Sequence, residues 1–383
     1  MASDSLSRRN FINSATAAAG VFSIVAPEAV RGSQANSKIS VGLIGSGGRG
    51  SYDAKYVHSD PRARVTALCD LFDDRLEKSA AEIGVQSPKT FKDFEKLLAS
   101  PDIDAVIIAT PPFEHPRMFE AAVEAKKHIY CEKPMGVDFP GVQRSLKAAR
   151  KADKSKTISV GFQQRYGPVY LEAYKRLKNG DIGELGTARA FWLGGPPWDI
   201  HPVDDPKISK LRNWFATREY SGDIIVEQDC HNFDVLHWFL DARPISAVGH
   251  GGQKLRKGPG WEVMDNLSLT FTFPNDLIVN YEANQLCPKG FNHVGEEFSG
   301  KTGLLATSRA KLVHFKGPKD VETIESKRDI TYDAFDDFLN RVINNEPANV
   351  GERSAISTLF AILGRTAIYQ NREATWKGEF GNV

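Results

Sequence analysis

The sequence predicts an α/β protein in which a doubly wound parallel sheet comes first and a second, β-rich α/β domain follows. Between residues 38 and 161, short apolar runs alternate with amphipathic helical segments, a pattern typical of parallel sheets. A glycine-rich turn, Gly45–Gly50, directly follows the first apolar run. Between residues 187 and 283 the chain is rich in β-formers, and Pro274–Asp276 is a hairpin turn signal.

Within the first region, strands and helices are expected in strict alternation. The expected strands are 38–44, 64–69, 104–109, 128–131 and 157–161, and the expected helices are 50–58, 73–83, 93–99, 116–125 and 139–151. Ligands of such sheets bind at the carboxyl ends of the strands. The motifs described below lie at such ends.

Composition excludes several classes of protein. The 383 residues carry 49 Lys and Arg against 48 Asp and Glu, and this balance argues against a nucleic-acid binder. No run of about 18 apolar residues occurs, so we expect no stable membrane insertion. The four cysteines have no zinc-ligand spacing and no HExxH motif is present, so we expect no metal site.

The first 37 residues have the pattern of an export signal. Ser7–Ile12 contains the pair Arg8-Arg9, and an Ala-rich apolar stretch and the small residues of Ser33–Ala35 follow. Twin arginines before Phe and Ile are typical of the Tat pathway. The alternative is an amphipathic first helix with two surface arginines. We expect the Tat export machinery as a partner and a periplasmic location for the folded protein.

The glycine-rich turn has the pattern of a dinucleotide site. Gly45, Gly47 and Gly50 form G-x-G-x-x-G between a strand and a helix, and Asp70 ends the next strand. The glycines permit a tight turn, close approach of a pyrophosphate and close helix–strand packing. A carboxylate at Asp70 would bind the ribose hydroxyls and repel a 2′-phosphate. The pattern predicts a Rossmann domain that binds NAD, while the nearby Arg75 leaves NADP open.

Motifs at other strand ends carry a resemblance to a known family. The glycine-rich turn, Ala109–Pro111 followed by His115, and Glu132–Pro134 together resemble the Gfo/Idh/MocA oxidoreductases, which include glucose–fructose oxidoreductase and inositol dehydrogenase. Gly161–Tyr166 is similar to that family as well. The resemblance implies a second α/β domain with a large open, mainly antiparallel sheet facing the cofactor. Such sheets often pair, which implies a homodimer or homotetramer.

The resemblance also sets the expected domain boundaries. Residues 1–37 are a signal and linker, 38–160 the NAD-binding Rossmann domain, 161–350 the substrate-binding sheet domain, and 351–383 a C-terminal helix and tail packing back on the body. Residues 194–222 show no periodicity and are expected to form a long loop, which is usually functional or disordered.

The expected cofactor-binding residues combine the glycine pattern with the resemblance. They are Gly45, Gly47, Gly48, Arg49, Gly50, Asp70, Thr110, Pro111, His115, Glu132 and Lys133. Of these, His115 lies at a helix start, where it either lines the cofactor or only caps the helix.

Three further site residues are expected on a helix from residue 222 to 240. Glu227, His231 and Asp234 are spaced i, i+4 and i+7 and would share one face. The family segment usually reads Asp-x-Gly-x-His-x-x-Asp, so Glu227 replaces its first Asp, and Asp229 stands where Gly is common. This departure leaves open whether Glu227 is catalytic or only caps or pairs. A metal site at these three side chains is a weaker alternative.

The chemistry of alcohol oxidation explains the residue types. Removing a hydride from a carbinol also requires removing its hydroxyl proton, and histidine is the natural acid/base near neutral pH. Lys133 would bind the same oxygen and stabilise developing alkoxide charge. Either Lys133 or His231 could be the base. The resemblance also implies substrate contacts from Arg165, Tyr166, Asp234 and His231.

These patterns predict an exported NAD-dependent oxidoreductase that acts on a CH–OH group of a carbohydrate or cyclitol. Two alternatives stay open. One is a redox-neutral NAD-dependent glycosidase or keto-sugar lyase on the same fold, which oxidises a ring hydroxyl, eliminates and reduces back. The other is a non-catalytic binding protein that kept the fold.

Overall fold

The structure, a computed structural model, describes residues 38–383. The twin-arginine segment lies outside the described residues. Within the described part of the chain, no helix is both long and apolar enough to span a bilayer.

The first sheet has six strands in the order β3-β2-β1-β4-β5-β6, and every neighbouring pair is parallel. The strands are β1 (Ile39–Ile44), β2 (Ala63–Cys69), β3 (Lys89–Phe91), β4 (Ala105–Ile108), β5 (His128–Cys131) and β6 (Ile158–Val160). All six residues of β1 are buried, because helices cover both faces of a parallel sheet. The predicted Rossmann fold is confirmed, and β3 is an additional short strand that the sequence did not reveal.

Helices from both ends of the chain cover this sheet. One face packs on α2 (Gly48–Ser59), α3 (Asp73–Ile83) and α12 (Ile330–Ile343), and the other packs on α4 (Phe94–Leu98), α5 (His115–Glu124) and α6 (Phe139–Lys151). The helix α12 packs on the sheet through aromatic rings: Phe335 of α12 stacks on Tyr130 of β5, with the ring centroids 4.0 Å apart. The C-terminal region therefore completes the N-terminal core.

The second sheet has nine strands in the order β14-β13-β12-β11-β7-β10-β9-β8-β15. Its pairs are antiparallel except for β7 with β10. The strands are β7 (Leu185–Gly194), β8 (Ser246–Gly252), β9 (Asn266–Thr272), β10 (Ile278–Asn284), β11 (Asn292–Gly300), β12 (Leu304–Thr307), β13 (Lys311–Gly317), β14 (Asp320–Glu325) and β15 (Ala374–Thr375). The predicted open, mainly antiparallel sheet is confirmed.

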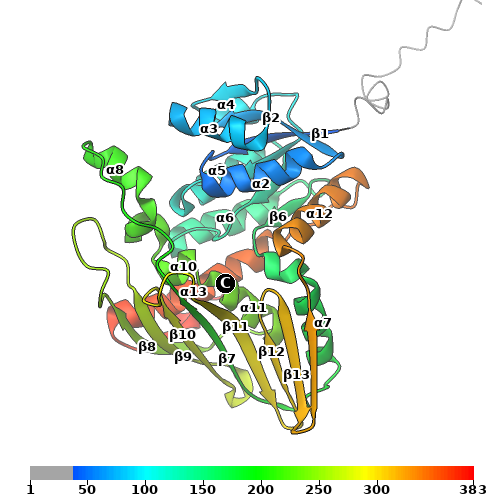
Figure 1. The fold of residues 1–383 in the computed structure, drawn as a ribbon, viewed down its shortest axis with the longest axis vertical. Helices are drawn as coiled ribbons and strands as arrows, with labels where there is room; N and C mark the ends of the chain where they lie inside the picture. Colours follow the sequence, from blue (N-terminus) through cyan, green and yellow to red (C-terminus); the bar gives the residue numbers. More distant parts are fainter. Residues whose placement is uncertain (1–37) are drawn as a thin grey trace, which may run out of the picture. The chain divides into compact units, whose positions relative to one another are not determined.

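Three helices, α7 (Pro168–Lys178), α11 (Cys230–Leu240) and α13 (Gly351–Gln370), pack on the inner face of this sheet. Phe233 of α11 lies 4.5 Å from Tyr281 of β10 and 4.9 Å from Phe360 of α13, measured between ring centroids. Figure 1 shows α12 and α13 lying between the two sheets. Because α13 also contacts α6, the two sheets share one continuous core.

The segment expected as a loop from residue 194 to 222 is partly helical. It contains α8 (Pro206–Arg212) and α9 (Arg218–Ser221). Asp205 caps α8 and Pro206 occupies its first turn, and both are helix-start signals. Arg212 pairs with Asp74 at 2.7 Å and lies over the ring of Phe72. These contacts tie the segment to the Rossmann domain.

The helix expected from residue 222 to 240 is also corrected. It is divided into α10 (Ile224–Glu227) and α11, with Gln228 and Asp229 between them. Asp223 has a φ of 77°, and its carboxylate accepts from the N–H groups of Ile224 and Met264. This buried cap sets the direction of α10 separately from α11, so Glu227 and His231 do not belong to one regular helix.

Candidate active site

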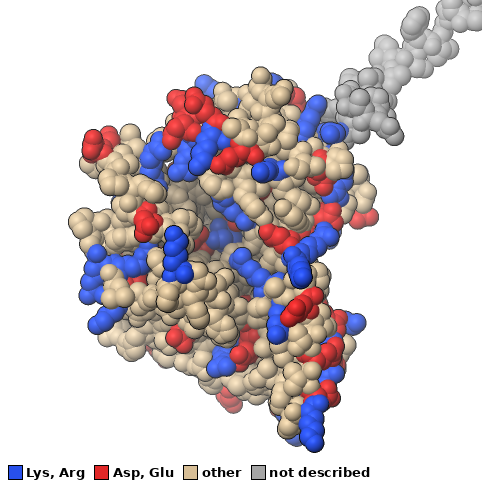
Figure 2. Space-filling view, viewed as in Figure 1, with Lys and Arg blue, Asp and Glu red and all other residues tan. Residues whose placement is uncertain are grey.

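A cavity of about 770 Å³ lies at the carboxyl ends of the strands of the first sheet. Its walls include residues that end or follow β1, β2, β4 and β5, together with Trp192 of β7 and His231 of α11. Figure 2 shows the face of the molecule that is hollowed between the two sheets. The strand order reverses between β1 and β4, which is where ligands bind in such sheets.

The glycine-rich loop fits a dinucleotide. A Cβ at Gly45 would lie 2.6 Å from the carbonyl oxygen of Ala109, and one at Gly50 only 2.0 Å from that of Gly45. A Cβ at Gly48 would meet open space, and no side chain caps the start of α2 at Gly47. Gly45 and Gly50 are therefore required for packing. Gly47 and Gly48 begin a helix whose free N–H groups face room for phosphates.

Asp70 lies at the cofactor end of this cavity. Its carboxylate accepts from the N–H of Ser46 at 2.9 Å and from the N–H of Phe72 at 3.0 Å. These bonds fix its orientation and leave further lone pairs for ribose hydroxyls. Arg75 also lines the cavity, and its Nη1 lies 3.0 Å from the position of a Cβ on Gly47.

Replacing Asp70 by serine should reduce the preference for NAD over NADP by about 10-fold or more, the scale of one lost charge-assisted hydrogen bond. Titration of both nucleotides into the native and D70S proteins measures this preference. Asp181→Ser is a matched control, because Asp181 is exposed and does not line the cavity. Tighter binding of NADP than of NAD by the native protein would show that Arg75 overrides Asp70.

Arg49 and Glu132, both expected at the cofactor, line the cavity but bind each other. Arg49 donates to Glu132 Oε1 at 2.8 Å and lies 3.2 Å from buried Asp53. Burial acts to lower the pKa of Arg49, but the two carboxyl groups outweigh it and keep the guanidinium charged. A Cβ at Gly161 would lie 2.6 Å from Glu132 Oε2. The pair thus gives the floor of the cavity a fixed charge arrangement.

His115 holds two turns of the cavity wall together. Its Nδ1 lies 2.7 Å from the carbonyl oxygen of Pro134, and its Nε2 lies 2.9 Å from that of Thr110. Burial lowers its pKa. Thr110 and Pro111 line the cavity beside it. His115 therefore positions the segments that follow β4 and β5, rather than capping α5.

Lys133 and Glu227 meet across the cavity. Lys133 Nζ donates to Glu227 Oε1 at 2.9 Å and to the carbonyl oxygen of Glu227 at 2.5 Å. Burial acts to lower the pKa of Lys133, but the neighbouring Glu227 carboxylate outweighs this effect and raises the pKa above its ordinary value. Lys133 is therefore a hydrogen-bond donor with a fixed positive charge.

His231 is 4% exposed and lies near two aromatic rings. The ring centroids of Phe162 and Trp192 are each 6.0 Å from its own. Burial, and then the positive charges of Lys133 and Arg309, lower its pKa well below the ordinary value. Its Nδ1 has no hydrogen-bond partner among residues 38–383. A neutral imidazole beside an ammonium group can accept a proton from a hydroxyl that the ammonium binds.

Sequence models of one family match both parts of the chain. The model described as "Oxidoreductase family, NAD-binding Rossmann fold" matches residues 39–162, and its C-terminal domain model matches residues 170–306. Together they span more than half of the sequence. The chain belongs to the Gfo/Idh/MocA family. The match confirms the predictions of an oxidoreductase and of an NAD-binding domain.

Relatives extend over most of the chain. A scyllo-inositol 2-dehydrogenase (NAD(+)) of Bacillus subtilis is 28% identical over 311 residues, which are 79% of this chain and 82% of that protein. Scyllo-inositol dehydrogenase of Lactobacillus casei, solved with NAD(H) and scyllo-inositol, is 19% identical, with a TM-score of 0.71 over 88% of this chain and 99% of that chain. Levoglucosan dehydrogenase in complex with NADH is 18% identical, with a TM-score of 0.74 over the same shares.

Three residues expected at the substrate of this Gfo/Idh/MocA chain do not line the cavity: Arg165, Tyr166 and Asp234. Arg165 forms two parallel hydrogen bonds to Asp234, at 2.8 and 2.9 Å. Ser357 donates to the same carboxylate at 2.7 Å. Because a buried carboxylate needs such partners, the pair links the segment after β6 to α11. Tyr166 packs with the core beside α12.

Other cavity residues were not found from the sequence. They include Arg309, on the turn between β12 and β13, together with Gln163 and Gln228. The sequence carried no usable signal for Arg309, because the strands on either side of it were not predicted. Within residues 38–383, no group of three or more His, Cys, Asp or Glu side chains could hold a metal ion.

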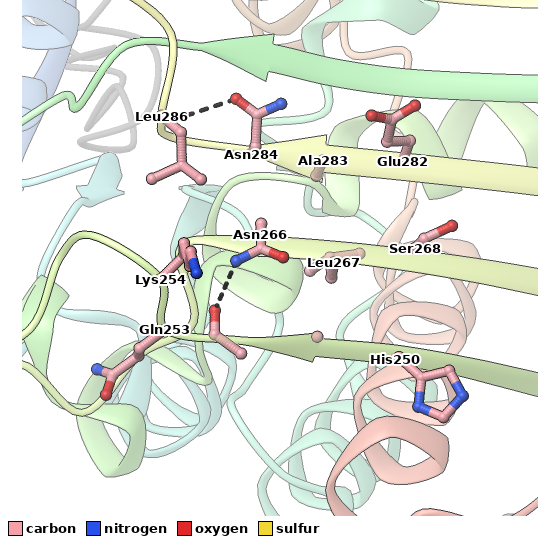
Figure 3. Close-up of a pocket in the computed structure, with 12 residues that line it drawn as sticks. His250, Gln253, Lys254, Asn266, Leu267, Ser268, Glu282, Ala283, Asn284 and Leu286 are labelled. Atoms are coloured by element: carbon pink, nitrogen blue, oxygen red, sulfur yellow. Dashed lines mark hydrogen bonds between the residues drawn. The ribbon is translucent and has the colours of Figure 1, made fainter.

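A second hollow, of about 640 Å³, lies on the outer face of the large sheet. Figure 3 shows its lining on three neighbouring strands, with Glu282, Ser268 and His250 standing out from them. These three side chains are exposed, and neither Lys133 nor the glycine-rich loop lines this hollow. The larger cavity is therefore the candidate active site.

Proposed function

We propose that the protein is an NAD-dependent dehydrogenase of a secondary alcohol in a carbohydrate or cyclitol. The observation that carries this proposal is that Lys133, Glu227 and His231 line the same cavity as the glycine-rich loop. The named activities of the relatives, on inositols and levoglucosan, support the same substrate class. A binding protein without activity would have no need of this acid/base arrangement.

The residues divide the reaction between them. NAD, when bound at the glycine-rich loop and Asp70, supplies an acceptor for a hydride. Lys133 donates a hydrogen bond to the substrate hydroxyl oxygen and stabilises the negative charge that develops on it. His231 accepts the hydroxyl proton as the neutral imidazole. Glu227 keeps Lys133 charged and correctly oriented through its 2.9 Å hydrogen bond.

The proposal is tested by turnover measurements on the full chain. Inositols, hexoses, uronates and methyl glycosides are supplied with NAD, while NADH absorbance and sugar products are followed together. We expect ketone and NADH in equal amounts from at least one substrate. Many turnovers of product without net NADH would instead identify the redox-neutral reaction. Neither signal from any substrate would contradict a dehydrogenase of this class.

We also propose that residues 1–37 direct export of the folded protein to the periplasm through Tat. The support is the pair Arg8-Arg9 before Phe11 and the apolar stretch that follows. Replacing both arginines by lysine should leave the protein in the cytoplasm of fractionated cells. Arg31→Lys is a matched control in the same segment. Unchanged periplasmic delivery of the double variant would contradict the proposal.

A further inference from the structure

Arg309 is a cation of the active-site cavity that has no assigned role. It lies on the turn between β12 and β13, and its guanidinium lies 5.6 Å from the ring centroid of Trp192. The ring of Trp192 lies in turn 6.0 Å from that of His231. Arg309 therefore belongs to the wall that carries the proposed base, where the substrate would sit.

The other cations of the cavity are nearly all neutralised. Seven lysines and arginines line it, namely Arg49, Arg75, Lys92, Arg117, Lys133, Arg212 and Arg309. Five of these form ion pairs with a carboxylate. Of the seven cavity cations, only Arg75 and Arg309 form no ion pair with a carboxylate of residues 38–383. Arg75 lies against Gly47 of the cofactor loop, so Arg309 is the cation on the substrate wall that forms no close ion pair.

A buried carboxyl group links the turn that carries Arg309 to the residue next to His231. Glu296 of β11 is fully buried. Its Oε1 accepts from Asn232 Nδ2 at 2.7 Å, and its Oε2 accepts from Thr307 Oγ1 at 2.6 Å. Asn232 directly follows His231, and Thr307 lies two residues before Arg309. The Arg309 side chain is exposed, but its turn is attached through Glu296 to the residue that follows the proposed base.

We propose that Arg309 binds a carboxylate of the substrate, so that the substrate is a sugar acid of the uronate class rather than a neutral sugar. A substrate that fills the cavity removes water from this guanidinium, and the cost of desolvating a charge is offset best by an opposite charge that also accepts its hydrogen bonds. The planar guanidinium matches a carboxylate with two parallel hydrogen bonds. This inference deepens the proposed function and rests on a sugar occupying the cavity.

A carboxylate fits this wall better than a phosphate does. Phosphate groups are usually bound by several donors at once, often at a helix N-terminus. Here the uncapped helix N-terminus of α2 belongs to the cofactor loop, and Arg309 lies on a tight turn between antiparallel strands. A single guanidinium neutralises a single carboxylate.

The test is calorimetric binding to the full chain with NAD present. Two matched pairs of probes are used: glucuronate with glucose, and galacturonate with galactose. We expect the uronate of at least one pair to bind about 10-fold or more tightly than its neutral partner. Arg309→Gln should remove this difference and leave NAD affinity unchanged. Arg309→Lys, which keeps the charge without the fork, should retain part of it.

Lys311→Gln is the matched control, because Lys311 is an exposed cation on the adjacent strand that does not line the cavity. The proposal is overturned if neither uronate binds better than its neutral partner, or if R309Q retains the difference. An equal loss of NAD affinity in R309Q would assign Arg309 to the cofactor instead. Tighter binding of glucose 6-phosphate than of either uronate would assign it to phosphate.

The binding experiment is independent of turnover. If a uronate binds through Arg309 but yields neither NADH nor a ketone, the proposed dehydrogenase activity fails while the carboxylate site stands. If neutral polyols are oxidised and uronates are not bound, the activity stands and the carboxylate site fails.

Discussion

Replacing Lys133 by methionine should lower kcat and kcat/KM together, by about 100-fold or more. The ammonium group acts on the oxygen whose charge changes during the reaction, so its loss affects the transition state more than the bound substrate. NAD affinity should change little, because the glycine-rich loop and Asp70 remain. Steady-state kinetics and nucleotide titration on the same preparation separate the two effects.

The structure supplies the controls for this variant. Removing Lys133 leaves Glu227 without the hydrogen bond that it now accepts at 2.9 Å, so K133M must be checked for unchanged thermal unfolding. Lys133→Arg keeps the charge but not the compact ammonium, and should recover only part of the rate. Lys147→Met, at an exposed position of α6, should have native kinetics. Near-native turnover of K133M would remove Lys133 from the mechanism.

Replacing His231 by alanine should also reduce turnover by about 100-fold or more, the usual contribution of a general base. The imidazole lies 6.0 Å from the Trp192 ring, and its removal leaves the Lys133–Glu227 pair intact. His231→Asn keeps a polar group of similar size without the base. Both variants should bind NAD normally. Near-normal turnover in H231A would assign the proton transfer to Lys133.

The pH profile offers a second readout of the same residue. The pKa of His231 lies well below its ordinary value of 6.5, through burial first and then through the charge of Lys133. Its base form therefore persists as the pH falls through 6.5, where an ordinary histidine would become protonated. The pKa of Lys133 is raised, so its acid form persists as the pH rises through neutrality. We therefore expect kcat/KM to stay constant from below pH 6.5 to above neutral pH. A fall in kcat/KM centred near pH 6.5 would contradict this expectation.

Several elements have the bounds that the sequence predicted. The helices Asp73–Ile83 and Phe139–Lys151 and the strand His128–Cys131 agree to the residue. Each helix carries a local signal at one end: Gly84 in the left-handed conformation after the first, and the Asp138 side chain capping the second. Such signals act within a few residues of chain, so they can be read without a fold.

Elements without local signals were missed. The strands β11, β13 and β14 mix apolar and charged residues, with several exposed side chains, and β12 has only four residues. Their pairing supplies the stability that their composition does not. The helix α8 carries start signals at Asp205 and Pro206, but its seven residues are too few to show a helical period, and its attachment to the Rossmann domain by Arg212 and Asp74 is a long-range contact.

The residues of the candidate site also separate into those that local sequence signals identify and those that only long-range contacts bring to the cavity. The glycine-rich turn, Asp70 and Lys133 were identifiable because the carboxyl ends of parallel strands bring motif residues to one edge of the sheet. Glu227 and His231 were chosen for a helical spacing, and both line the cavity although they lie on two separate helices. Asp234 shared that spacing but turns instead to Arg165, because a buried carboxylate requires a cation that the sequence does not reveal. Arg309 reaches the cavity only because β12 and β13 pair into a hairpin. Local chemistry thus selects the candidate residues, and long-range packing determines which of them meet.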